Sequence, residues 1–361
     1  MSLWDEASLP TPNKSDPGST PTLTMPSGAL WIRKYKILVT DAQDNEALNV
    51  SELHCTFEVH KRRGRGGFYA IVRIYNLTAD TENKLVMEGD RLIIEAGYTT
   101  QAIQDKTDEN GNEVKDKDGN TETEQVDAQY GKIFDGRIIW PSRSRESNVD
   151  YILTLMAIDG DQPLNLNFIS KTVNRGLNAR KTIETVSGGS EVQTPVNYIS
   201  EGLSTQEFPR GKVFFGDPYR YIQETCRGNQ ASFYIENGSL NVTRLQDTAK
   251  DEAIVMTPEN GLIGTPQQVQ FGVSFKILLN PTIHLGSLIK IQGVQVDEAS
   301  VTPGQQQAPL DDEWIYQAIE ITHVGDTRGN DWYTEINGIS RYGTGALAAL
   351  LSNAGQNGNG V

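Results

Sequence analysis

Histidine and cysteine side chains at short spacing are the usual ligands of a protein metal site. The chain of 361 residues has four histidines and two cysteines: His54, His60, His284, His323, Cys55 and Cys226. His54 and His60 share a face of one expected strand, but six residues along a strand span roughly 20 Å. No pair suits one ion, so we predict no metal and no cofactor. The cysteines lie far apart in apolar contexts, which predicts two buried free thiols.

Residues 116–120 (DKDGN) superficially resemble part of a calcium-binding loop. An EF-hand loop needs an oxygen ligand at its first position and a Glu at its twelfth. Here those positions hold Val114 and Gln125, so the pattern fails. We interpret this stretch as the solvated tip of a hairpin.

Four cations gather in a glycine-rich turn with the sequence KRRGRGG, namely Lys61, Arg62, Arg63 and Arg65. They could bind phosphate groups, or they could pair with an acidic neighbouring protein. An isolated basic turn in a chain of net charge -15 favours the second interpretation. We therefore predict that these four residues contact another subunit or a partner.

Residues 325–329 (GDTRG) raise the question of a phosphate-binding loop, which would need a Lys after the last glycine and a following helix. Instead, Asn330 and Trp332 open a strand. We interpret Asp326 and Arg328 as a pair that holds a turn, either with each other or across an interface. Asp326, Arg328, Asn330 and Trp332 complete the set of predicted interface residues.

No arrangement of residues predicts catalysis. Carboxylates occur near the ends of expected strands, at Glu146, Asp150, Asp159 and Asp161. Nothing in their spacing marks two of them as the acid and base of a glycosidase, and the G-x-S-x-G nucleophile pattern does not occur. We predict that the chain is not an enzyme and assign no catalytic residue.

Composition limits the class of protein. The length predicts two or three domains, and 34 glycines with 15 prolines favour strands and turns over long helices. A net charge of -15 disfavours a nucleic-acid binder and a protein that binds anionic membranes. There is no signal-peptide pattern and no apolar run of about 20 residues, so we expect no membrane insertion and a cytoplasmic setting.

Strands account for most of the elements that the sequence predicts. Over residues 54–60, strict alternation places Cys55, Phe57 and Val59 on one buried face. Similar patterns predict strands at residues 35–39, 68–74, 92–97, 130–140, 151–158, 269–279, 283–291, 314–323 and 332–339. Short connections between them indicate antiparallel pairing.

The middle of the chain has a different pattern. Residues 177–186 have helical spacing with Asn178 as the cap, and a second helix begins at Asp217-Pro218. After this second helix, the Asn-Gly pair at residues 237–238 predicts the turn of a hairpin. We expect five parts: an extended N-terminal arm at 1–31, a β domain at 32–161 with an exposed acidic excursion at 101–129, a small α+β domain at 162–250, a second β domain at 251–342, and a C-terminal tail at 343–361.

Five blocks of this sequence resemble the baseplate hub proteins of contractile-tailed bacteriophages. They occur in order at residues 74–98, 133–161, 211–245, 261–291 (GLIGTP, GVSF and LLNPTIHLG) and 321–338 (ITHVGDTRGNDWYTEING). Together they cover most of residues 32–342.

The resemblance implies a mainly β fold with two tail-tube-like antiparallel β-barrel domains beside the small α+β domain. It further implies a homotrimer that continues a six-fold tail tube, carries the central spike protein and contacts other baseplate proteins in the virion. Such a hub would be assembled in the host cytoplasm. DNA would pass through the channel without sequence-specific binding, and an acidic channel lining would let it slide.

Two other classes of protein remain open. A virion-associated glycan-binding or cell-wall-degrading β-protein would need clustered exposed aromatic side chains over paired carboxylates. The candidates for such a cluster are Trp314, Trp332 and Tyr333, which packing inside a strand core explains as well. A nucleic-acid-binding barrel is disfavoured by the net charge.

Overall fold

The computed structural model describes residues 22–24, 32–40, 47–77, 90–99, 102–105, 123–126, 129–145, 150–160, 167–244, 247, 252–269, 272–297 and 314–340. Apart from residues 22–24, the predicted arm lies outside these ranges, as do the predicted tail and the calcium-like stretch at 116–120. None of the helices in the described ranges is long and apolar enough to cross a membrane.

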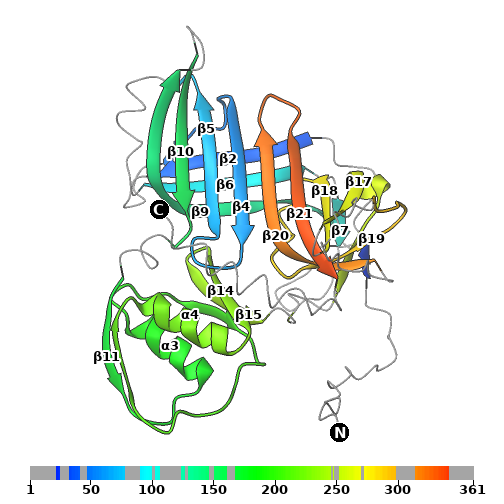
Figure 1. Cartoon of the computed structure of the whole chain (residues 1–361). Helices are drawn as coiled ribbons and strands as arrows, with labels where there is room; N and C mark the ends of the chain where they lie inside the picture. The colour runs from blue at the N-terminus through cyan, green and yellow to red at the C-terminus, as the bar shows by residue number, and fades with distance from the viewer. Residues whose placement is uncertain are drawn as a thin grey trace, which may run out of the picture.

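Fourteen strands form one large sheet (Figure 1). Its first part consists of β2 (Ile32–Thr40), β3 (Ala47–Asn49), β4 (Cys55–Arg62), β5 (Phe68–Tyr75), β6 (Arg91–Thr99), β9 (Gln129–Arg145) and β10 (Tyr151–Ile158). Its second part consists of β1 (Thr22–Thr24), β16 (Ala253–Met256), β17 (Leu262–Val269), β18 (Gly272–Leu278), β19 (Leu288–Ile291), β20 (Ile315–Asp326) and β21 (Trp332–Ser340). The mainly β fold and its antiparallel pairing are confirmed, although β1, β16 and β19 pair in parallel.

Strand β20 joins the two parts. One of its edges pairs with β21, and the other pairs first with β19 and then with β4. The two predicted β domains are therefore continuous through backbone hydrogen bonds. Their closure into separate barrels stays a prediction.

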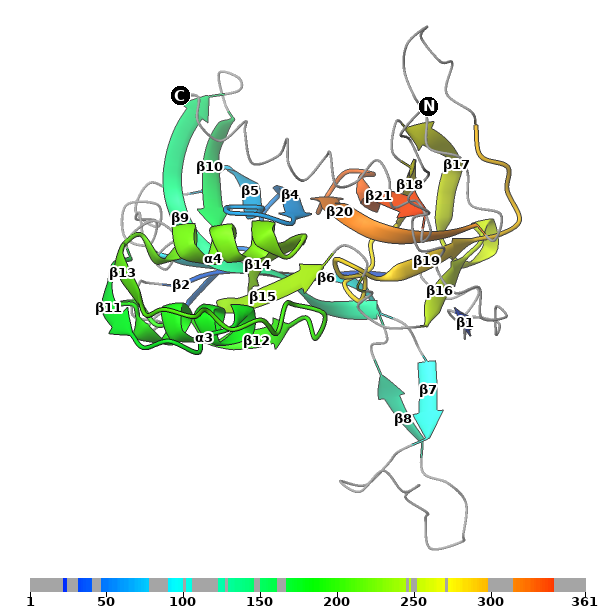
Figure 2. The same ribbon diagram turned by 60° about the horizontal axis from the view of Figure 1, so that its bottom comes forward.

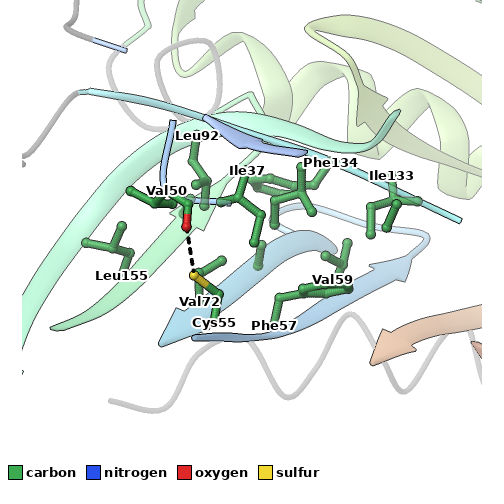
Figure 3. Close-up of a cluster of buried hydrophobic side chains, with 14 of the residues drawn as sticks. Ile37, Val50, Cys55, Phe57, Val59, Val72, Leu92, Ile133, Phe134 and Leu155 are labelled. Carbon is green, nitrogen blue, oxygen red and sulfur yellow. Dashed lines mark hydrogen bonds between the residues drawn. The ribbon is translucent and has the colours of Figure 1, made fainter. Parts of the chain in front are cut away.

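The alternation predicted for residues 54–60 is confirmed, because every second side chain of β4 and β5 is buried. These side chains pack between β4, β5 and β10 on one side and β2, β6 and the first half of β9 on the other (Figure 3). A second core lies under β17–β21 and includes Phe275, Ile289 and Ile336. Each core covers one face of the sheet.

The opposite face of the sheet forms a trough (Figure 2). Strands β9 and β10 rise along one side and β17 and β18 along the other, with β5, β4, β20 and β21 between them. We call this surface the trough face. Its side chains are the half-exposed ones of each strand, such as Glu58, Arg73 and Glu335.

The middle of the chain forms a separate α+β unit with its own core. It contains β11 (Ile169–Val173), α3 (Ala179–Gly189), β12 (Val196–Ile199), β13 (Lys212–Gly216), α4 (Pro218–Gly228), β14 (Ala231–Glu236) and β15 (Ser239–Arg244). The side chains of Asn178 and Asp217 accept the backbone N–H groups of Lys181 and Tyr219, which confirms both predicted helix starts.

Two predicted strands were wrong in extent. Residues 269–279 were expected as one strand, but β17 ends at Val269 and pairs back on β18 from Gly272. Alternation alone could not show this, because both arms of a hairpin keep the same period. Of residues 283–291, only β19 is a strand. The chain turns before it, because the Asn280 side chain accepts the backbone N–H of Thr282 and Gly286 has a φ of +90°.

The described residues of the acidic excursion at 101–129 form a hairpin, in agreement with our interpretation of residues 116–120 as a hairpin tip, although the tip itself lies outside the described ranges. Strands β7 (Ala102–Asp105) and β8 (Thr123–Val126) pair in a two-stranded sheet of their own. This ribbon projects from the large sheet on the side away from the trough (Figure 2).

Candidate functional site

The turn between β20 and β21 is held by side chains from both β parts. One carboxylate oxygen of Asp326 accepts the backbone N–H groups of Arg328 (2.9 Å) and Gly329 (2.7 Å) and lies 2.9 Å from Nε2 of His54. The Arg33 guanidinium donates to the carbonyl oxygen of Gly329 at 2.6 Å. Asp326 therefore holds the turn, mainly through the backbone.

Electrostatics reinforce this arrangement. Partial burial raises the pKa of Asp326. The hydrogen bonds from the two backbone N–H groups and from His54 lower it by more, so the pKa lies below its usual 3.8. The guanidinium of Arg328 donates instead to the carbonyl oxygen of Glu52, at 2.9 Å. The turn of the second β part is thus tied to the loop before β4.

An open pocket of about 400 Å³ lies beside this turn and is lined by Glu52, Leu53, His54, Tyr75, Asn76, Asp150 and Arg328. The His54 ring stacks on Tyr75, with 4.3 Å between ring centroids. Enzyme and ligand sites are usually enclosed and mostly apolar. This pocket, in contrast, is open to solvent, and its lining includes the charged side chains of Glu52, Asp150 and Arg328.

Trp332 lies in the chain's own core. Its side chain is 2% exposed and packs against Phe57 and Tyr35, with ring centroids 5.4 and 5.7 Å away. Its indole N–H donates to the carbonyl oxygen of Gly97 at 3.3 Å. It is therefore not on the surface where we placed it, whereas Arg328 and Asn330 are exposed.

The basic turn lies at the other end of β4, so the two groups of predicted interface residues are not brought together. Lys61 is 3% exposed, and its Nζ lies 3.4 Å from Glu236 at the end of β14. Nδ1 of His284 lies 3.4 Å from the same carboxylate oxygen. Burial raises the pKa of Glu236, but His284 and Lys61 outweigh it and hold the pKa below its usual value.

Two other basic residues of this turn, Arg63 and Arg65, also contact the α+β unit. Arg63 is buried and donates to the carbonyl oxygen of Arg244 at 3.3 Å, while Arg65 lies 2.7 Å from Asp217. We expected contact with an acidic neighbour, and the contacts in this structure are to groups of the same chain. Arg62 is exposed and remains a proposed contact with another protein.

Asp159 lies at the same junction. Its carboxylate accepts the backbone N–H groups of Asn237 (2.5 Å) and Gly238 (3.0 Å) in the β14–β15 turn. The side chain is 4% exposed, and burial raises its pKa from 3.8 to about 7, although the two N–H groups lower it. A group with this pKa is partly protonated at neutral pH.

Replacing Asp159 with asparagine should change how stability depends on pH. The folded chain holds a proton on Asp159 up to about pH 7, whereas the unfolded chain loses it near pH 3.8, so this group destabilises the fold as pH rises between those values. The gap between the two pKa values is equivalent to about 4 kcal/mol at most. We expect the natural chain to lose stability between pH 5 and pH 8 in urea unfolding, and Asp159→Asn, which has no proton to lose there, to show a smaller loss over the same range.

Asp326→Asn is the matched control for this measurement. Its carboxylate has a lowered pKa, so its contribution is present above about pH 4 and is lost on acidification. That variant should lose stability at both pH 5 and pH 8. Parallel pH curves for the natural chain and Asp159→Asn would contradict our view of Asp159.

Charges on the trough face are paired across strands. Arg73 lies 3.4 Å from Glu58, and Lys276 lies 3.7 Å from Glu335. The side-chain amide of Asn337 donates to a Glu320 carboxylate oxygen at 3.1 Å. The face therefore carries both signs of charge side by side.

Within the described ranges, no group of three His, Cys, Asp or Glu side chains could hold a metal ion. Both cysteines are buried free thiols, as predicted, and burial raises the pKa of each to about 12. Of the aromatic side chains considered for a glycan site, Trp332 is buried, so it cannot belong to the exposed aromatic cluster that such a site would need.

Sequence reasoning missed His54, Arg33 and Glu236 as contact residues. His54 was considered only as a metal ligand, and its partner Asp326 lies 272 positions away. No local pattern marks such a pair, because its geometry depends on the β4–β20 pairing.

The fold is similar to that of solved phage tail proteins. The 43 kDa tail protein of prophage MuSo2 from Shewanella oneidensis matches with a TM-score of 0.52 and 8% identity, over 85% of this chain and 99% of that chain. The tail protein from Neisseria meningitidis MC58 matches with a TM-score of 0.51 and 8% identity, over 86% and 97%. At such identity these likenesses concern the fold alone.

Residues 44–296 match the model of the family described as baseplate hub gp41, and the chain belongs to that family. The predicted family is confirmed, and it assigns the chain a structural role in a phage tail. No curated protein sequence matches the chain.

Proposed function

We propose that three copies of this chain form the hub of a contractile-tail baseplate, which joins the tail tube to the central spike. The observation that carries the proposal is the single sheet that runs through both β parts across β4 and β20. Each chain then supplies two tube-like parts whose relative position is fixed. Three chains therefore present six such parts, as many as one ring of a six-fold tube. The division into domains at 32–161, 162–250 and 251–342 belongs to this proposal.

In this hub the trough face lines the channel through which DNA passes. The net charge of the chain led us to expect an acidic lining. The ion pairs Arg73–Glu58 and Lys276–Glu335 support a charge-paired lining instead. Such a surface neither concentrates phosphate charge nor strongly repels it, so DNA slides without sequence-specific binding. The role is structural and involves no catalysis.

Light scattering on the purified chain tests the proposal, first alone and then with the spike protein encoded beside it. We expect a three-fold mass for the chain alone, or a complex of three chains with three spike subunits. A chain that stays monomeric under both conditions would contradict the hub.

A further inference from the structure

The turn between β14 and β15 contains an Asn-Gly pair, Asn237 and Gly238. Both residues have left-handed backbone, with φ of +52° and +74°, as the two-residue turn of a hairpin requires. The carboxamide of Asn237 is exposed and makes no hydrogen bond within the described part of the chain. Outside the strand pairing, the turn is held through its two backbone N–H groups, which Asp159 accepts at 2.5 and 3.0 Å.

An Asn-Gly pair can deamidate without an enzyme. The backbone nitrogen of Gly238 gives up its proton and attacks Cγ of Asn237, so that a nitrogen–carbon bond forms. The Cγ–Nδ2 bond breaks, and the amide nitrogen leaves as ammonia with the proton that Gly238 gave up. Water then opens the cyclic imide to aspartate or isoaspartate. Glycine favours this reaction, because it has no side chain to shield its nitrogen.

Two other Asn-Gly pairs lie in the described ranges, and both have a fixed side chain. The Asn260 carboxamide is buried, donates to the carbonyl oxygen of Val255 at 2.8 Å and accepts the backbone N–H of Thr257 at 2.6 Å. A carboxamide held at both ends cannot swing onto the next backbone nitrogen. The remaining pairs of the sequence, at residues 110–111, 357–358 and 359–360, lie outside these ranges.

The second of these pairs lies inside β21. Gly338 is paired with a strand on each side, and the Asn337 carboxamide donates to Glu320 at 3.1 Å. The backbone of a paired strand cannot rotate to close the imide ring. Of the three pairs that the structure describes, only the one in the β14–β15 turn therefore has a carboxamide without a hydrogen bond.

Asp159 determines whether this pair reacts. Ring closure needs a Gly238 nitrogen that can lose its proton and a turn that can rotate at Asn237. The hydrogen bonds to Asp159 oppose both, and this carboxyl group is 4% exposed. Leaving a buried acceptor without its donors is costly. The pair is thus protected while the turn stays docked on Asp159 at the end of β10.

We propose that Asn237 is a deamidation site whose reaction Asp159 holds back while the α+β unit is docked on the large sheet. This inference does not depend on the hub, because it concerns a single chain. Isoaspartate adds a methylene carbon to the backbone of a two-residue turn, so the two N–H groups no longer align with Asp159. Deamidation therefore makes a loss of docking permanent.

Ageing of the folded chain at neutral pH, followed by proteolysis and mass spectrometry of the peptides, measures the rate at each pair. In Asp159→Ala the rate at Asn237 should rise about tenfold, the effect on a barrier of losing such a hydrogen bond. The rates at Asn260 and Asn337 should not change, so these two sites report any opening of the whole fold. Asp159→Asn keeps one acceptor oxygen and should give a smaller rise, again at Asn237 alone.

An unchanged rate at Asn237 in both variants would overturn the proposal. Equal rises at all three pairs in both variants would also overturn it, because the protection would then come from the fold as a whole. If only Asp159→Ala unfolds and exposes all three pairs, the result for Asp159→Asn decides.

The permanent loss of docking has its own test. The fraction of the natural chain that is deamidated at Asn237 can be separated by ion exchange, because it carries an added negative charge, and identified by the same peptide mapping. It should unfold at a lower urea concentration than the unmodified fraction. Equal midpoints would overturn this part of the proposal.

Discussion

Replacing Trp332 with alanine is expected to lower the free energy of unfolding by about 3–5 kcal/mol, the usual cost of truncating a buried tryptophan. The side chain is 2% exposed and packs in the first core, although it belongs to β21 of the second β part. The variant loses the packing against Phe57 and Tyr35. It also leaves the carbonyl oxygen of Gly97 without the indole donor.

Tyr333→Ala is the control, because Tyr333 is the next residue of β21 and is half-buried on the other face. We expect that variant to lose about 1 kcal/mol. Guanidinium unfolding followed by far-ultraviolet circular dichroism measures both values. A loss below about 1 kcal/mol in Trp332→Ala would show that the two β parts do not share this core.

Replacing Glu236 with glutamine is expected to cost about 3–5 kcal/mol, because it leaves the buried Lys61 ammonium without its negative partner. Lys61 is 3% exposed, and its Nζ lies 3.4 Å from the carboxylate. Glutamine keeps the shape of Glu236 but removes its charge. The variant should therefore loosen the junction where β4, the β14–β15 hairpin and the loop with His284 meet.

The double variant Lys61→Met/Glu236→Gln separates charge from packing. Methionine keeps the apolar contact of the Lys61 stem over the Phe68 ring, whose centroid lies 5.9 Å from Nζ. Since no unpaired charge is then buried, the double variant should recover most of the stability lost in Glu236→Gln. Urea unfolding of the natural chain, Glu236→Gln, Lys61→Met and the double variant gives the coupling energy, and additive losses would contradict a buried ion pair.

Features set by short-range pattern were predictable from the sequence. The alternation around Phe57 gave the buried face of β4, and the caps at Asn178 and Asp217 gave both helix starts. The Asn-Gly pair at residues 237–238 gave the turn between β14 and β15, where Asn237 has a φ of +52°. In each case the residues that decide the structure are neighbours in sequence.

Features that depend on long-range pairing were not predictable. The period of a strand shows which side chains share a face, but it does not show which strand lies beside it. The pairing of β4 with β20 decides that His54 meets Asp326 and that Trp332 enters the first core. For the same reason, Lys61 was expected at a subunit contact, while its partner Glu236 lies in the same chain.

Electron cryomicroscopy of the purified oligomer tests the central claim most directly. We predict a three-fold ring around an open channel, with the trough face of β10, β5, β4, β20, β21 and β18 turned toward the channel. A ring in which this face points outward, or a particle without a channel, would contradict the proposed hub.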